Sequence, residues 1–195
     1  MLSIPYHIVL GSQSPRRKEL LKSAGFDFRV LDIDYDEQIP KDYENLENIP
    51  EYLAEQKALH AKGLKEKDLL ITADTLVFLD GKILGKPRDI DQAFEMLSSL
   101  SGKMHKVITG VCLKYGQHTV KFSDTSNVYF KTLDAEEIEY YIENYNVLDK
   151  AGAYGAQDWI GLTTIEKIEG SYFNVMGLPV HKVYEALKAL ENNRS

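Results

Sequence analysis

Residues 8–21 read Ile8-Val9-Leu10-Gly11-Ser12-Gln13-Ser14-Pro15-Arg16-Arg17-Lys18-Glu19-Leu20-Leu21. The first three form a short apolar run that is typical of a buried strand. Ser14 suits the N-cap of a helix, and Pro15 suits its first position. Gly25 is a natural residue at which that helix ends. The stretch therefore predicts a strand, a tight turn and a helix.

The same turn concentrates groups that bind anions. The backbone N–H groups at a helix start, together with the helix dipole, favour negative charge there. Arg16 and Arg17 add forked donors that match phosphate oxygens. Two arginines in a first turn oppose the dipole by about 0.3–1 kcal/mol per charge unless an anion is bound. The turn, with Ser12 and Ser14, predicts a phosphate site; the alternative is an ordinary solvated basic surface.

The composition limits the classes of function. The chain has 195 residues, 44% hydrophobic and 27% charged, with a net charge of −7. This acidity argues against nonspecific binding to nucleic acid. The single cysteine, Cys112, excludes an internal disulfide and fits a reducing compartment. Without a signal-peptide pattern or an apolar run of about 20 residues, we expect a cytoplasmic protein with no membrane contact.

Strand and helix patterns alternate along the rest of the chain. Strands are predicted at 26–33, 68–79, 82–84, 105–115, 119–130 and 163–168, and helices at 50–63, 89–100, 134–145 and 177–190. Two loops are expected at 41–48 and 149–159. Because 105–130 resembles a hairpin, the sheet should be mixed. No linker divides the chain, so a single domain over 1–195 is predicted.

Asp74 is the main catalytic candidate. It interrupts the apolar strand 68–79, where a buried carboxylate needs a partner, a hydrogen bond or a metal. The alternative is an aspartate that caps a turn at the end of a strand. Glu37, Lys57 and Lys86 are further candidates, although each alone can be an ordinary surface residue.

The loop 149–157 is rich in small residues that let a flat ligand approach the backbone. Its Gln157 carries an amide, which can read the edge of a base through one acceptor and its donors. An ordinary surface loop is the alternative.

In order, these segments resemble the Maf family of nucleoside triphosphate pyrophosphatases over nearly the whole chain. Each block alone is short, but the ordered set is specific. The matching blocks are 12–21, 55–58, 73–75, 84–87, 100–105, 149–157, 170–172 and 177–179.

The resemblance implies an elongated mixed α/β fold similar to that of the inosine-triphosphate pyrophosphatases (ITPase-like), with a mixed sheet flanked by helices and two lobes around a cleft. It implies hydrolysis of a nucleoside triphosphate to the monophosphate and pyrophosphate, with a divalent metal, Mg²⁺ or Mn²⁺. A homodimer is the arrangement that the family suggests. The implied roles are proton acceptor for Asp74, metal ligation by Glu37 and Asp74, and phosphate binding by Ser12, Ser14, Arg16, Arg17, Lys57 and Lys86.

The block 149–157 resembles the subfamily that acts on dTTP and UTP, in which Arg16, Thr75 and Gln157 match the specificity positions. Two departures are present. Gly11 stands where alanine is common, and Asp158-Trp159 replaces the usual small residues after Gln157.

Two alternative functions remain open. One is a pyrophosphatase for 7-methyl-GTP or another modified nucleotide, and the other is a nonenzymatic protein of septum inhibition and cell-division control.

Overall fold

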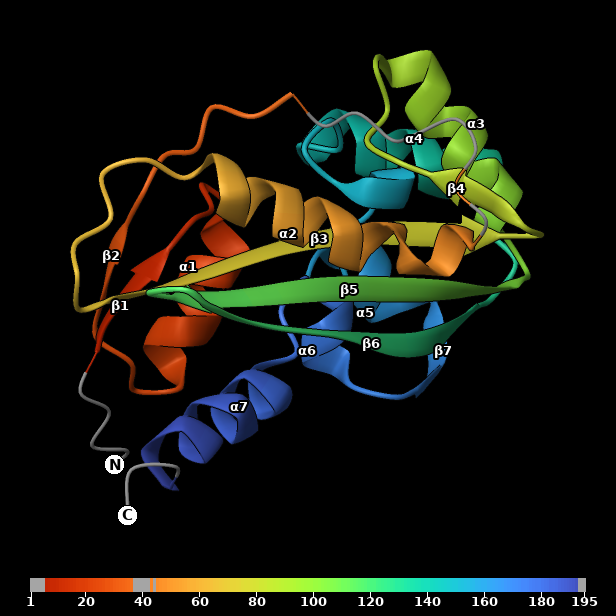
Figure 1. Ribbon diagram of the computed structural model, residues 1–195. Coiled ribbons are helices and arrows are strands. Elements are labelled where there is room, and N and C mark those ends of the chain that lie inside the picture. The colour runs from red at the N-terminus through yellow and green to blue at the C-terminus, as the bar shows by residue number, and fades with distance from the viewer. Residues whose placement is uncertain (1–5, 37–42, 44, 193–195) are drawn as a thin grey trace. The chain divides into compact units, whose positions relative to one another are not determined.

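The computed structural model describes residues 6–36, 43 and 45–192 (Figure 1). Within them a seven-stranded sheet has the order β2-β1-β3-β5-β6-β7, with β4 paired to β3. The strands are β1 (His7–Leu10), β2 (Phe28–Val30), β3 (Asp68–Leu79), β4 (Lys82–Leu84), β5 (Met104–Tyr115), β6 (His118–Phe130) and β7 (Ile165–Glu169). The helices are α1 (Pro15–Ser23), α2 (Ile49–His60), α3 (Ile90–Leu100), α4 (Ala135–Asn144), α5 (Trp159–Thr164), α6 (Tyr172–Val175) and α7 (Val180–Asn192), with short 3₁₀ turns η1 (Leu46–Asn48) and η2 (Ala151–Ala153).

The sheet is mixed, as predicted. β1 runs parallel to β2 and to β3, whereas the β3–β4 and β6–β7 pairs are antiparallel. The mixed α/β fold with helices flanking the sheet is therefore confirmed.

The chain divides into two compact units, each assembled from separate stretches. Unit 1 comprises residues 1–74, 109–124 and 177–195, and unit 2 comprises 75–108 and 125–176. Strands β3, β5 and β6 have residues in both. The single domain over 1–195 and the cleft between two lobes stay predictions.

The opening unit forms as the sequence predicts. α1 begins at Pro15 and ends at Ser23, and Gly25 follows with φ +79°, donating its N–H to the Lys22 carbonyl. Ser14 occupies the N-cap position, but its side chain makes no capping hydrogen bond. A tight reversal joins β3 to β4, where Asp80 and Gly81 both have positive φ, as a two-residue hairpin turn requires.

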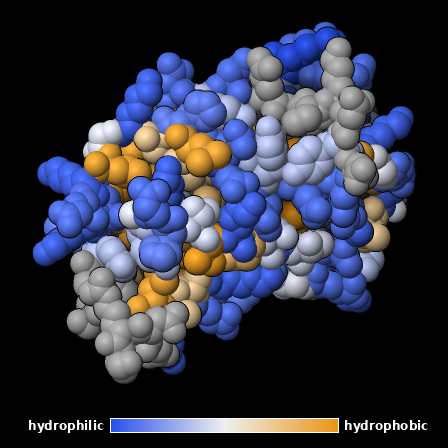
Figure 2. Space-filling view, in the orientation of Figure 1, coloured by the Kyte–Doolittle hydropathy of each residue, from blue (hydrophilic) through white to orange (hydrophobic). Residues whose placement is uncertain are grey.

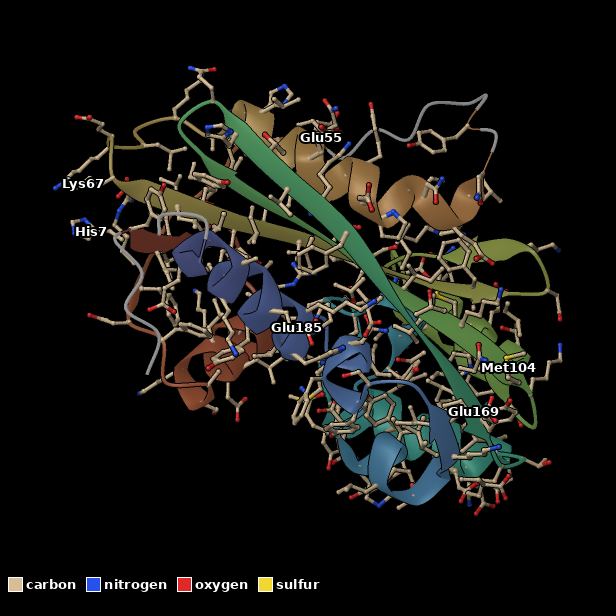
Figure 3. The ribbon with its side chains drawn as sticks, turned by 60° about the horizontal axis from the view of Figure 1, so that its bottom comes forward. His7, Glu55, Lys67, Met104, Glu169 and Glu185 are labelled. Carbon is tan, nitrogen blue, oxygen red and sulfur yellow. The ribbon has the colours of Figure 1, made fainter. Side chains whose placement is uncertain are left out.

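In unit 1 the period of two along β3 determines which side chains meet α2. Leu70, Thr72 and Asp74 alternate with Leu69 and Ile71, and so point to the other face of the strand. Leu70 packs with Val9 of β1, Cys112 of β5, and Ala54 and Ala58 of α2. Figures 1 and 3 show α2 on one side of these strands and α1 and α7 on the other.

Unit 2 has its own core around α3, α4 and the neighbouring parts of the strands. Asp89 caps α3 by accepting from the Gln92 N–H group. Asp134 and Glu137 form a reciprocal capping box at the start of α4. Both helix starts confirm the predicted boundaries.

Several boundaries differ from the prediction, among them the end of α2, which is His60 rather than residue 63, and the start of α7, which is Val180 rather than residue 177. β2 covers only Phe28–Val30 rather than 26–33. The predicted strand at 163–168 begins at Ile165, because Thr163 and Thr164 complete α5, where the Thr163 hydroxyl donates to the Trp159 carbonyl. A run of β-branched residues is typical of a strand, but a threonine is also accommodated in a helix, where its hydroxyl can bond to the carbonyl four residues earlier, as Thr163 does. Neither α5 nor α6 was predicted.

No helix among the described residues is both long and apolar enough to cross a membrane. Figure 2 shows one face on which hydrophilic side chains predominate, interrupted by small hydrophobic groups.

His105 of β5 is buried in unit 2. Its Nε2 lies 2.7 Å from the Tyr154 hydroxyl, and its ring packs edge-on against Phe130. Burial lowers the pKa of His105 from 6.5 to about 4. The imidazole is therefore neutral in the folded protein near neutral pH.

The buried histidine predicts a loss of stability in acid. The unfolded chain binds this proton below pH 6.5, but the folded chain does so only near pH 4. Above pH 6.5 the titration of His105 does not change the free energy of unfolding. As the pH falls from 6.5 to 4, the unfolded chain is favoured, and the free energy of unfolding decreases by about 3 kcal/mol. Urea unfolding across this range should show a smaller pH dependence for His105→Gln than for the wild type. The exposed His118→Gln control should follow the wild type, and equal slopes for the wild type and His105→Gln would contradict the assignment.

Candidate active site

The predicted phosphate turn in unit 1 is organised around Ser12 and Arg17. The Ser12 hydroxyl oxygen accepts from the Ser14 N–H at 3.3 Å and from Arg17 Nη1 at 3.2 Å. Arg17 Nε donates to the Gly177 carbonyl at 2.8 Å. Gly177, which precedes α7, thus fixes one edge of the guanidinium. Because Ser12 accepts two hydrogen bonds, its O–H is the group that it offers to a ligand.

The first turn of α1 has the charge pattern expected from the sequence. It contains Arg16 and Arg17 and no acidic residue. The intrahelical hydrogen bonds begin at the Lys18 N–H, which donates to the Ser14 carbonyl. The helix start is therefore electropositive from both the backbone and the side chains.

Asp74 and Lys57 form the second part of unit 1's constellation. Lys57 Nζ donates to Asp74 Oδ1 at 2.5 Å, and the exposed fractions of the two side chains are 14% and 9%. Asp74 is therefore an ion-paired carboxylate within the strand rather than a cap at its end. The predicted catalytic and phosphate-binding residues meet directly here.

The position of α2 beside β3 brings Lys57 within reach of Asp74. The Thr72 hydroxyl, one strand period before Asp74, donates to the Ala54 carbonyl at 2.6 Å. Ala54 lies one helical turn before Lys57, so this bond fixes the helix register opposite the strand. Glu55 of α2, labelled in Figure 3, pairs with Lys121 of β6 at 2.8 Å.

Gly110 of β5 permits α2 to approach the strand at backbone distance. A Cβ atom at Gly110 would overlap the Glu51 nitrogen and the Pro50 carbonyl carbon. A glycine inside a strand often marks such an approach. Gly11 is likewise crowded, since a Cβ there would lie 2.5 Å from Ile33 Cδ1 and 2.8 Å from Thr72 Cγ2. An alanine at position 11 would therefore clash with these side chains, which explains why glycine suits this position in the present chain.

In unit 2, contacts link the segments that carry Thr75, Lys86 and Gln157. Thr75 is half-buried in β3, and Lys86 is exposed after β4. The Gly152 N–H donates to the Gly85 carbonyl at 3.0 Å, and Gly152 packs on Val77. The loop of Gln157 is therefore attached to the segment before Lys86 and to the part of β3 that belongs to unit 2, which begins at Thr75.

Gln157 is one of several described residues that have a buried side-chain polar atom without a hydrogen-bond partner. Its Oε1 atom is buried and has no hydrogen-bond partner in the part of the chain that the structure describes. A buried acceptor without a partner is costly, and a water, an ion or a bound ligand can supply the missing donor. This observation favours the base-reading role predicted from the sequence.

Two residues of the same loop have a role that the sequence reasoning missed. Lys150 is buried and lies 3.5 Å from Asp158 Oδ2, and the Tyr141 hydroxyl donates to the same oxygen at 2.7 Å. The sequence presented Asp158 only as a departure from the family pattern. A lysine in a loop of small residues was the available signal, because a buried ammonium needs a carboxylate.

The predicted metal site is only partly described. Glu37 lies outside the described residues. Among the residues that are described, no group of three or more His, Cys, Asp or Glu side chains could hold a metal ion.

The profile of the Maf family, described as "Maf-like protein", matches residues 7–190. A relative from Bacteroides thetaiotaomicron, named dTTP/UTP pyrophosphatase, is 50% identical over 187 residues, which cover 95% of this chain and 96% of that protein. Proteins of the same name from Porphyromonas gingivalis W83 and Flavobacterium johnsoniae are 50% and 47% identical. The alignments cover 94% of both chains in the first case and 95% in the second.

The contact at Gly110 predicts a large loss of stability when a methyl group is added. Because the obstructing atoms belong to the backbone, Gly110→Ala must displace α2 and should lower the free energy of unfolding by about 3 kcal/mol. Urea denaturation measures this. Gly85→Ala is the matched control, because a Cβ there meets nothing within 4 Å. Similar stability of the two variants would contradict the close approach.

Proposed function

The chain belongs to the Maf family, and we propose that it hydrolyses dTTP and UTP to the monophosphate and pyrophosphate, which removes unwanted nucleotides from the pool. The similarity to proteins named dTTP/UTP pyrophosphatase, about 50% identical over nearly the full length, carries this proposal. The Lys57–Asp74 pair and the anchored Arg17 provide the chemistry that such a reaction needs.

Asp74 is the proposed general base. Attack of water on the α-phosphorus requires a group that orients the water and accepts its proton. Lys57 holds Asp74 Oδ1, and this contact fixes the direction in which the carboxylate faces. We therefore assign Lys57 to positioning the base, in addition to the phosphate contact expected from the resemblance.

The turn of unit 1 is the proposed phosphate site. Ser12, Ser14, Arg16 and Arg17 lie where the N–H groups and the dipole of α1 favour an anion. As pyrophosphate leaves, negative charge accumulates on its oxygens, and fixed cations stabilise that charge. Lys86 keeps its predicted phosphate role, and Arg16, Thr75 and Gln157 keep their roles in base selection, as part of this proposal.

A divalent metal, Mg²⁺ or Mn²⁺, is also proposed. Mg²⁺ is commonly held by one or two carboxylates together with substrate phosphates. Asp74 supplies one carboxylate of this donor set, and Glu37, which lies outside the described residues, is proposed as the other. When bound, the metal would neutralise charge on the triphosphate.

We also propose a cytoplasmic location and a homodimeric state. The thiol of Cys112 is free and buried, which agrees with a reducing cytoplasm. A homodimer stays a proposal taken from the family resemblance.

A nucleotide panel tests the function. With Mg²⁺, the protein should release pyrophosphate from dTTP and UTP faster than from CTP, purine nucleotides or 7-methyl-GTP. Asp74→Asn should lower kcat by about 10²–10⁴-fold, because the base is lost, while nucleotide binding persists. Asp80→Asn, near the end of the same strand and exposed, is the matched control.

Other outcomes of the panel would contradict the proposal. Release of orthophosphate as the first product would show that the protein does not cleave the bond between the α- and β-phosphates. A preference for 7-methyl-GTP would support the alternative substrate class instead. An unchanged rate for Asp74→Asn would remove Asp74 from the chemistry.

A further inference from the structure

Gln157 lies at the corner of a tight turn in unit 2. The Asp158 N–H donates to the Gly155 carbonyl at 3.1 Å, so residues 155–158 form a turn with Gln157 at its third position. A Cβ at Gly161 would overlap the Ala156 carbonyl oxygen, so α5 packs directly against this turn. The turn therefore has little freedom on that side.

The hydroxyl of Tyr141 fastens both ends of the turn. It accepts from the Gly155 N–H at 3.1 Å and donates to Asp158 Oδ2 at 2.7 Å. Tyr141 belongs to α4 and is fully buried. Burial and the adjacent Asp158 carboxylate raise the pKa of Tyr141, so the hydroxyl keeps its proton. One rigid phenol thus joins the first and fourth residues of the turn.

The ammonium of Lys150 is a second partner of the Asp158 carboxylate, at 3.5 Å. The exposed fractions of the two side chains are 9% and 17%, and Nζ also contacts the Asn146 carbonyl and lies 3.0 Å from Asp149 Oδ1. Removing the Asp158 charge would leave a buried ammonium with less compensation. The carboxylate is consequently held from two sides, by Lys150 and by Tyr141.

These anchors surround a side chain whose acceptor is incomplete. Gln157 Oε1 is buried and unpartnered in the described part of the chain, although the flanking backbone is tightly bonded. An acceptor held in this way suits a ligand that presents an N–H donor beside a carbonyl. The imide edge of uracil or thymine has this pattern, with its donor at N3, whereas cytosine has an unprotonated N3 and carries its donor on the 4-amino group. The direction in which the Gln157 acceptor is held therefore decides which base it can accept from.

We propose that Tyr141 and Asp158 are positioning residues for base selection, holding the turn that aims the Gln157 amide at the imide edge of a uracil or thymine base. This inference rests on the proposed function. It assigns a role to Asp158 that follows from its contacts rather than from the family pattern. Neither residue touches the nucleotide; both act through Gln157.

The test compares single hydroxyl and charge removals. Tyr141→Phe deletes the atom that joins Gly155 to Asp158, and Asp158→Asn removes the charge that faces Lys150. The matched controls are Tyr145→Phe, whose ring stacks on Tyr141 at 5.0 Å, and Asp149→Asn, which faces Lys150 from its exposed side. The readout is kcat/KM for UTP divided by kcat/KM for CTP. This ratio does not depend on the fraction of folded enzyme.

We expect the ratio to fall by about tenfold in Tyr141→Phe and Asp158→Asn, mainly through a higher KM for UTP, because loose positioning weakens discrimination. Both controls should keep the wild-type ratio. An unchanged ratio in either folded variant, even with lower thermal stability, would overturn the positioning role. Failure of the wild type to release pyrophosphate from UTP would instead overturn the proposed function. If one variant does not fold, the other decides.

Discussion

The ion pair between Lys57 and Asp74 is the interaction on which unit 1 depends. A carboxylate inside an apolar strand is costly to bury, and a lysine on the facing helix offsets that cost. The pair exists only because α2 lies close to the strands. Gly110 gives the helix room, and the Thr72 hydroxyl sets its register against the Ala54 carbonyl. Loss of either contact should therefore disturb the proposed base before any substrate is bound.

In unit 2, buried polar contacts likewise surround one side chain of proposed function, Gln157. Here the side chain that matters is neutral, and the rigidity comes from the Tyr141 hydroxyl and from the Lys150–Asp158 pair. In both units a buried ionic contact lies beside a side chain for which we propose a function, Asp74 in unit 1 and Gln157 in unit 2. Such contacts are specific in geometry, since a partly satisfied buried charge is worse than none.

The sequence predicted what local patterns encode. Ser14-Pro15, Asp89 and Asp134 marked helix starts, and the polar interruption of an apolar strand identified Asp74. The contact between Arg17 and the Gly177 carbonyl joins residues 160 positions apart, so no local pattern could reveal it. Gly110 gave only a weak sign, because a glycine in a strand has several explanations. Asp158 was only a departure from the family pattern until its partners were visible. Thr163 was wrongly placed in a strand because its β-branched side chain is typical of strands, although it lies in the last turn of α5.

A double-mutant cycle on kcat for dTTP tests most directly whether Lys57 acts through Asp74. The enzymes compared are the wild type, Lys57→Met, Asp74→Asn and the double variant. If the pair works as a unit, Lys57→Met slows the wild type but has little further effect on Asp74→Asn, and the double variant is about as slow as Asp74→Asn alone. An equal fold-reduction by Lys57→Met in both backgrounds would contradict this account.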